Sequence, residues 1–339
     1  MNNIPPVLVS FIRGKIVESR HRGWICIVDS SGKLLYSEGN PMFSTFLRSS
    51  AKPLQSVAVV LTGASEKYDL KEAEMSIISG SHGGEPFHVD TVRSILSKCG
   101  MNEDMLQNGP HPPLDETARK ILKSQGKTPL RLHHNCSGKH AGMLAATKVL
   151  GGDLGKYLDP ESPVQQKITN VIGAIAGIEA GEIELGIDGC SAPVHSLSMY
   201  GSALAYARLL DPVDLDADLA LACKRVTRAI RMYPEMIAAQ QGRICTELIR
   251  AGKVFELIAK GGAEGFYSAG WRDSNSGRGI GLSIKIEDGS QRARDPLVIK
   301  VLQNYGVLPN ELGQELKTFE SKPIFNFAKS TVGKILIEV

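Results

Sequence analysis

Strand-forming segments occupy both ends of the chain, and this arrangement constrains the fold more than any other feature. Near the amino terminus they cover residues 7–12, 15–18, 24–29 and 33–37, and near the carboxyl terminus residues 254–259, 265–269, 279–287 and 332–339. A Ser-Ser-Gly turn separates two of the early segments, as is typical of a hairpin. We therefore expect the strands from both ends to join in one antiparallel sheet.

The middle of the chain has a helical pattern. Apolar residues recur every three or four positions near residues 54–62, 88–98, 115–123, 138–149, 163–176, 196–210 and 217–231, and a further helix is expected near 295–305. The sequence thus predicts an α/β fold with one catalytic domain over residues 1–339. Strands from about 5–40 and 254–339 form the sheet, and the region of about 50–250 packs with it as a mainly helical lobe.

Composition limits the class of partner. Of the 339 residues 42% are apolar and 22% are charged, which is typical of a soluble globular protein. The net charge is +3, and the 39 basic residues do not cluster with aromatic ones, so we expect a small-molecule partner rather than nucleic acid. The amino terminus lacks the basic region of a signal peptide, which predicts a cytoplasmic protein with reduced cysteines.

A serine and a lysine lie three residues apart at the start of a helical segment, Ser49 and Lys52. On the first turn of a helix this spacing puts both side chains on one face, so the amine can take the hydroxyl proton. The next residue, Pro53, is tolerated in a first turn. The alternative is a capping serine on a solvated helix. The position of Ser49 between a predicted hairpin and a buried helix favours the first interpretation, a nucleophile at the edge of the core.

Two glycine-containing segments add polar side chains. Ser81 and His82 lie in the glycine-rich segment 78–85, which is either a turn with a capping serine or a place where substrate can approach the main chain. Lys260 lies where a predicted strand runs into glycines. It is either a solvated turn residue or a lysine presented to a cleft.

Two of the six cysteines lie in polar segments that contain glycine. Cys136 precedes a helix, a position that lowers the pKa of a thiol, and with Cys190 it can supply two soft ligands to zinc. His140, His195 or a neutral lysine are candidates for the third ligand. Without a metal, the two thiols can form a reversible disulfide. Asp188, close to the second cysteine, can hold a substrate ammonium or form an Asx turn.

Taken together, these segments resemble the Rhizobium etli-type L-asparaginase family. In chain order the matching blocks are Val17-Glu18-Ser19 with His21 and Gly23, Arg48-Ser49-Ser50-Ala51-Lys52-Pro53, Ser81-His82, Asn135-Cys136-Ser137-Gly138-Lys139-His140, Asp188-Gly189-Cys190, and Lys260 followed by Ala263-Glu264-Gly265. They span nearly the whole chain, and their joint occurrence is far more specific than any single block. Local departures at Gly83-Gly84 and Gly262 leave every candidate catalytic group in place.

The resemblance implies a fold similar to serine β-lactamases and glutaminases, a homodimer, and hydrolysis of L-asparagine to L-aspartate and ammonia. It implies two Ser-Lys pairs, which by motif match are Ser49 with Lys52 and Ser81 with Lys260. The remaining expected site residues are a zinc set, Cys136, Lys139 and Cys190, and a substrate-binding set, Arg48, His82 and Asp188. In this second set, Arg48 is expected to hold the α-carboxylate and Asp188 the α-ammonium.

The mechanism expected from these residues is acyl transfer. A neutral lysine removes the proton of Ser49, which attacks the side-chain amide and releases ammonia, and water then releases aspartate. Burial and mutual repulsion are expected to lower the lysine pKa values. The alternatives are a glutaminase or another serine amidohydrolase, since one methylene discriminates by only about 1–3 kcal/mol, and a catalytically inactive, zinc-dependent amino-acid-binding protein.

Overall fold

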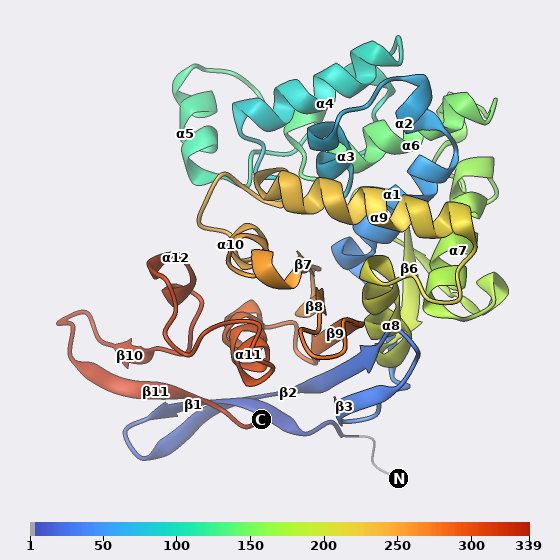
Figure 1. Ribbon diagram of the computed structural model, residues 1–339. Coiled ribbons are helices and arrows are strands. Elements are labelled where there is room, and N and C mark those ends of the chain that lie inside the picture. Colours follow the sequence, from blue (N-terminus) through green and yellow to red (C-terminus); the bar gives the residue numbers. More distant parts are fainter. Residues whose placement is uncertain (1–3) are drawn as a thin grey trace.

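The computed structural model describes residues 4–339, and its largest element is a sheet built from both ends of the chain (Figure 1). The hydrogen-bonded order is β10-β11-β1-β2-β9-β8-β7, with β3 beside β2. The strands are β1 (Val7–Arg13), β2 (Ile16–Asp29), β3 (Leu34–Glu38), β7 (Ile258–Gly261), β8 (Phe266–Arg272), β9 (Gly279–Ile286), β10 (Pro323–Phe325) and β11 (Thr331–Ile337). Their pairings are antiparallel, which confirms the predicted sheet.

The centre of the sheet is covered on both faces. Helices α8 (Met199–Leu210) and α11 (Gln291–Asn304) lie on opposite sides of β8 and β9 (Figure 1). Every residue of β9 is buried, and apart from Lys285 the strand is apolar or small throughout instead of alternating. The core therefore continues from the sheet into the helices.

Glycines on the sheet allow α8 to approach closely. A Cβ at Gly281 would lie 1.8 Å from the carbonyl oxygen of Ala203, and one at Gly279 would lie 2.4 Å from that of Ala207. Both partners are small residues on α8. The helix therefore packs directly against the strand backbone. A larger residue at either glycine would not fit at this separation.

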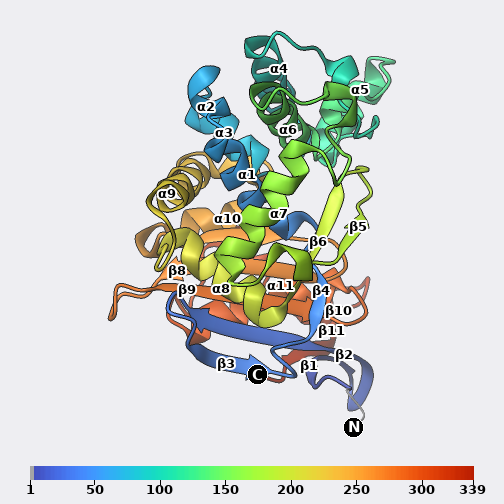
Figure 2. The same ribbon diagram turned by 90° about the vertical axis from the view of Figure 1, so that its right-hand side faces the viewer.

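A helical lobe stands above the sheet (Figure 2). Its helices are α1 (Lys52–Leu61), α2 (Ala64–Lys67), α3 (Glu72–Ile78), α4 (Pro86–Lys98), α5 (Glu116–Ser124), α6 (Ser137–Val149), α7 (Pro163–Ala176), α9 (Ala217–Met232) and α10 (Ile244–Ala251), and the short α12 (Gln314–Lys317) lies near the carboxyl terminus. In α1, residues Lys52 to Val60 are all buried. This helix is thus the centre of the lobe, and its first turn faces the sheet.

A second, small sheet joins the two parts. It has the order β4-β6-β5, with β4 (Ser44–Phe46), β5 (Leu185–Ile187) and β6 (Pro193–Ser198). Beyond the end of β4, the amide of Leu47 donates to the carbonyl oxygen of His195 at 3.0 Å. This pairing brings the segment before α1 next to the loop that carries Asp188 and Cys190.

Three local predictions were wrong. Residues 15–18 and 24–29 belong to one long strand, β2, because the polar residues between them pair with β1. The helix predicted over 196–210 begins at Met199, after β6. The strand predicted over 254–259 begins at Ile258, because Glu256 adopts a left-handed φ of 53° and ends a short 3-10 turn.

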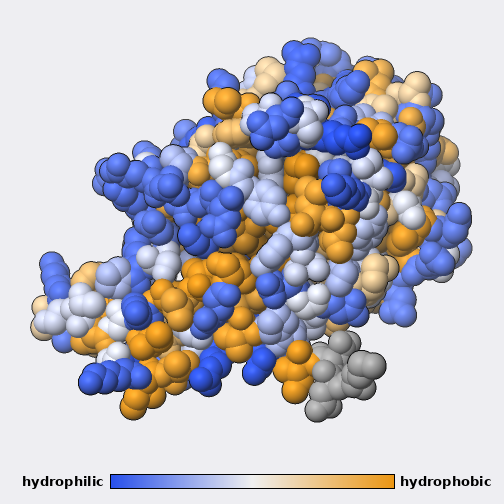
Figure 3. Space-filling model, turned by 60° about the horizontal axis from the view of Figure 1, so that its bottom comes forward, coloured by the Kyte–Doolittle hydropathy of each residue, from blue (hydrophilic) through white to orange (hydrophobic). Residues whose placement is uncertain are grey.

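The outer side of the sheet carries exposed apolar residues. Figure 3 shows apolar residues gathered across this face. Exposed apolar side chains on its strands include Ile16, Phe325 and Leu336. None of the helices in residues 4–339 is long and apolar enough to cross a membrane.

The contact between α8 and β9 is tested by Gly281→Ala. The added Cβ would overlap the Ala203 carbonyl, so we expect the free energy of unfolding to fall by about 3 kcal/mol. Gly181→Ala is the matched control, because nothing lies within 4 Å of the added atom. Denaturant unfolding measures both variants, and equal stabilities would contradict the packing described.

Candidate active site

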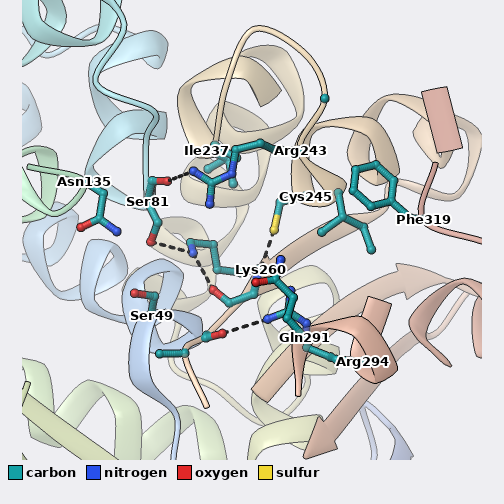
Figure 4. A pocket seen from close by; sticks show the side chains of 16 residues that line it. Ser49, Ser81, Asn135, Ile237, Arg243, Cys245, Lys260, Gln291, Arg294 and Phe319 are labelled. Carbon is teal, nitrogen blue, oxygen red and sulfur yellow. Dashed lines mark hydrogen bonds between the residues drawn. The ribbon is translucent and has the colours of Figure 1, made fainter. Parts of the chain in front are cut away.

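The segment before α1 holds Ser49 at the edge of a cavity. A short 3-10 helix begins at Arg48, which has a left-handed φ of 50°, a conformation that costs energy and is common at functional sites. The hydroxyl of Ser50 donates to the carbonyl oxygen of Lys260 at 2.7 Å, and the Tyr206 hydroxyl donates to the Ser50 carbonyl at 2.7 Å. These bonds fix the segment, and Ser49 remains half-buried and lines the cavity (Figure 4).

Lys52 is buried at the start of α1, and its amine meets three acceptors. The distances from Nζ are 2.6 Å to the carbonyl oxygen of Gly80, 2.8 Å to Oγ of Ser81 and 3.2 Å to the carbonyl oxygen of Asn135. Three acceptors match the three N–H groups of an ammonium. Burial lowers the pKa of Lys52, and a negative charge on Cys136 acts in the opposite direction.

Ser81 lies between two lysine amines. Its Oγ is 2.8 Å from Nζ of Lys52 and 2.9 Å from Nζ of Lys260, and the residue is only 5% exposed. Figure 4 shows the lysine from β7 reaching this hydroxyl. The preceding Gly80 permits the position, because a Cβ there would lie 2.3 Å from the carbonyl oxygen of Met236. A hydroxyl held in this way is well placed to pass protons between the amines.

The pKa of the Lys260 amine lies near neutrality. Burial lowers its pKa to about 7, and the positive charges of Lys52 and Arg243 contribute. Its Nζ also donates to the carbonyl oxygen of Gly261 at 2.9 Å. Near neutral pH a substantial fraction of this amine is therefore unprotonated and can accept a proton.

The structure brings the four predicted catalytic residues into one site, but with a different pairing. The predicted contact between Ser81 and Lys260 is present. The hydrogen bonds of the described residues do not include one between Ser49 and Lys52, because the Lys52 amine turns toward three other acceptors. Ser81 thus contacts both lysines, and Ser49 is left open to the cavity.

Arg48 and Asp188 contact each other. Nε and Nη2 of Arg48 donate to Oδ1 of Asp188 at 3.0 and 2.8 Å, and the amide of Gly189 donates to the same oxygen at 2.8 Å. Burial acts to raise the pKa of Asp188, but Lys139, the Gly189 amide and Arg48 outweigh it, so the pKa is lowered. The carboxylate therefore stays charged beside Arg48.

His82 is buried, and both of its ring nitrogens have partners in the protein. The Ser137 hydroxyl donates to the carbonyl oxygen of Leu132, so it accepts from Nε2 of His82 at 2.9 Å. Nδ1 then accepts from the amide of Gly84 at 3.2 Å. Burial lowers the pKa of His82 well below its usual value, so the ring is neutral and links the Ser81 loop to α6. Its substrate-binding role stays a prediction.

The two predicted zinc cysteines lie together in a buried cluster. Cys136 directly precedes α6, Cys190 lies on the loop between β5 and β6, and Nζ of Lys139 donates to Sγ of Cys190 at 3.2 Å. A hydrogen bond from Cys190 lowers the pKa of Cys136 well below its usual value, and Lys52 and Lys139 contribute. The cluster therefore combines a stabilised thiolate with an adjacent amine.

His140 faces the same cluster in a defined tautomer. The Tyr157 hydroxyl accepts from the amide of Gln107 at 2.8 Å, so it donates to Nδ1 of His140 at 2.7 Å. Nε2 then carries the hydrogen, and this buried atom has no hydrogen-bond partner within residues 4–339. In this state His140 is a donor toward the cluster and has no lone pair for a metal.

The cavity beside the serines has a volume of about 260 Å³. Besides Ser49, Ser81 and Lys260, its lining includes Asn135, Arg243, Cys245, Gln291, Arg294 and Phe319. Cys245 is a buried core side chain that also lines the cavity, and no sequence pattern singled out Arg243. The Gly-Arg pair before a helical segment is the available signal, and it is too common to indicate a site.

No curated protein matches this chain. Among solved structures, a probable glutaminase from Bacillus subtilis complexed with 6-diazo-5-oxo-L-norleucine is 14% identical, with a TM-score of 0.40 over 85% of this chain and 85% of that chain. Mglu in its native form in the presence of 4.3 M NaCl is 14% identical, with a TM-score of 0.47 over 87% of this chain and 63% of that chain. These structural likenesses are too distant to define an activity.

One protein family matches nearly the whole chain. A family model described as L-asparaginase II matches residues 9–337 and so includes every residue of the site described above. This agrees with the family predicted from the motifs. The chain therefore belongs to the L-asparaginase II family of amidohydrolases.

Proposed function

We propose that the protein hydrolyses L-asparagine to L-aspartate and ammonia through an acyl-enzyme. The observation that carries this proposal is the Ser81 hydroxyl between two buried lysine amines, at the wall of a cavity to which Ser49 is open. A cavity-facing hydroxyl next to a proton-accepting network is what Ser-Lys amide hydrolysis requires. Family membership supports an amide substrate.

Ser49 is the proposed nucleophile. Ser49 lines the cavity, and its hydroxyl forms no hydrogen bond with other side chains or the main chain in residues 4–339, whereas the oxygen of Ser81 is already engaged by both amines. A bond forms between Oγ of Ser49 and the side-chain carbonyl carbon. The Ser49 proton passes to Lys52, three residues away, as Lys52 gives one of its own protons through the Ser81 hydroxyl to the neutral amine of Lys260. The direct hydrogen bond forms in the substrate complex, as is common for catalytic contacts that are long in free enzymes.

Ser81 serves as the proton relay. It connects Lys52 and Lys260, so a proton taken from Ser49 can be delivered to the amide nitrogen as the C–N bond breaks and ammonia leaves. Water then attacks the ester carbon, the same network takes a proton from the water and returns it to Oγ of Ser49 as the Oγ–C bond breaks, and aspartate leaves. Burial, with the positive charge of Lys52 contributing, lowers the pKa of Lys260 and so keeps a fraction of this amine neutral for this purpose.

Asp188 is proposed to hold the α-ammonium of the substrate. Its carboxylate remains charged, and the contact with Arg48 orients it. The predicted contact between Arg48 and the α-carboxylate has less support, because two guanidinium nitrogens and the charge of Arg48 are already used by Asp188.

We also propose that Cys136, Lys139 and Cys190 hold zinc. No group of three or more Cys, His, Asp or Glu side chains in residues 4–339 is arranged for a metal, so the Lys139 amine must complete the set. Two sulfurs and an amine in one buried cluster fit the soft ligands that zinc takes. When bound, zinc would fix the two cysteine loops and provide positive charge for orienting the substrate.

The mechanism predicts different consequences for four substitutions. Ser49→Ala should lower kcat for L-asparagine at least about 1,000-fold, because the nucleophile is lost. Ser81→Ala, Lys52→Met and Lys260→Met should each lower it at least about 100-fold, because proton transfer fails. Ammonia release from L-asparagine and L-glutamine measures these effects.

The matched control is Ser202→Ala, which removes a buried hydroxyl on α8 outside the site. It should retain activity. Full activity in both Ser49→Ala and Ser81→Ala would contradict the mechanism. Tight binding of asparagine without ammonia release by the wild type would indicate the amino-acid-binding alternative.

The low pKa of Lys260 predicts the pH dependence. The amine must be neutral to accept a proton, and its pKa is about 7, compared with the usual value of about 10.4. We therefore expect kcat/KM to rise between about pH 6 and about pH 8 and then to level off. A profile that stays flat over this range, or that rises only near pH 10, would show that this amine does not control the reaction.

The zinc proposal predicts about one tightly bound zinc per chain by elemental analysis. Cys136→Ser and Cys190→Ser should weaken zinc binding at least about 100-fold, since each removes a ligand. Cys223→Ala, at a cysteine buried in the core on α9, should bind zinc like the wild type. Equal affinity in all three variants would rule out this site.

A further inference from the structure

Arg243 is the cation at the cavity whose donors are least used. Its side chain is half-buried and points toward Ser81 (Figure 4), where Nη1 donates to the Ser81 carbonyl oxygen at 3.2 Å. A guanidinium has five N–H donors. Within residues 4–339, the Arg243 side chain forms this one hydrogen bond. No carboxylate in residues 4–339 forms a salt bridge with it.

The other cations around the site are already engaged. Arg294 donates from Nε and Nη2 to the carboxylate of Asp295 at 2.8 and 2.6 Å, and from Nη1 to the carbonyl oxygen of Gly262 at 3.0 Å. Arg48 is paired with Asp188, and both lysines bond to Ser81. A negatively charged group entering the cavity therefore meets one cation that is free to bind it.

The amino-terminal end of α10 lies at the same cavity. Arg243 is the N-cap of this helix, which has no side-chain cap, and Gly242, Ile244 and Cys245 line the cavity as well. The carboxylate of Glu247, in the first turn, accepts from the amide of Gly242 at 2.7 Å and offsets part of the positive potential of this end. The carboxylate of Glu85 lies close enough for Arg243 to act on its pKa, but it accepts a hydrogen bond from the amide of Gln240 at 3.2 Å.

We propose that Arg243, supported by the first turn of α10, binds the α-carboxylate of the amino-acid substrate and selects for substrates that carry it. The inference rests on the proposed function. In asparagine two carbons separate the reacting carbonyl carbon from the carboxylate carbon. A substrate whose amide meets Ser49 and Ser81 can therefore reach a guanidinium that already contacts the Ser81 main chain within the same cavity.

The test compares L-asparagine with 3-aminopropanamide, which is the same molecule without its α-carboxylate. Arg243→Met should lower kcat/KM for L-asparagine by roughly 10- to 100-fold, mainly through KM, because a charge-assisted hydrogen bond is lost. Activity toward 3-aminopropanamide should change less than about threefold, so the preference for the carboxylate collapses. Arg243→Lys should recover part of the preference, because it restores the charge without the planar fork.

Two further variants identify the residue responsible. Arg250→Met makes the same change on the same helix, at an exposed arginine outside the cavity, and should keep the wild-type preference. Arg48→Met tests the other candidate for the carboxylate. If the preference collapses in Arg48→Met and persists in Arg243→Met, or if Arg243→Met loses activity toward both substrates equally, the inference is wrong.

Product binding separates this inference from the proposed reaction. Calorimetry should show that the wild type binds L-aspartate more tightly than β-alanine, and that Arg243→Met loses most of this difference. A wild type that binds aspartate through Arg243 but releases no ammonia would overturn the proposed reaction and leave this inference intact. Hydrolysis of asparagine with an unchanged preference in Arg243→Met would overturn this inference alone, and a wild type that neither binds aspartate nor hydrolyses asparagine would overturn both.

Discussion

The site depends on the hydrogen bonds of one buried group, the amine of Lys52. It enters the protein interior at the start of α1, where an unpaired charge would be very costly. Its three acceptors come from two separate loops, one carrying Gly80 and Ser81 and the other carrying Asn135. Satisfying one buried amine therefore positions Ser81 and the start of the cysteine cluster together.

The two halves of the fold supply the partners of this contact. The helical lobe provides Lys52 and the loop of Ser81, and the sheet provides Lys260 at the end of β7. Because β7 is held through β8 and β9 against α8, the second amine has little freedom to move away. Two amines that would repel each other in water are kept at one hydroxyl, and burial, with the charge of Lys52 contributing, accounts for the lowered pKa of Lys260.

Much of this arrangement follows from local sequence patterns. The β-branched terminal segments and the helical periodicity predict the sheet and most helices, and the motif residues Ser49, Lys52, Ser81 and Lys260 do meet. The turn of Lys52 away from Ser49 could not be predicted, because it depends on carbonyl groups from distant loops. Arg243 was missed for a similar reason, since its proposed role comes from the cavity beside it and not from its neighbours in the chain.

The central claim is that Ser49 forms an ester with the substrate, and trapping this intermediate tests it most directly. The enzyme is mixed with L-asparagine, quenched in acid within the first turnovers, and analysed by intact mass and peptide mapping. The account predicts an aspartyl adduct on the peptide that contains Ser49. An adduct on Ser81 would contradict it. Steady ammonia release in samples that show no adduct on any serine would contradict it as well.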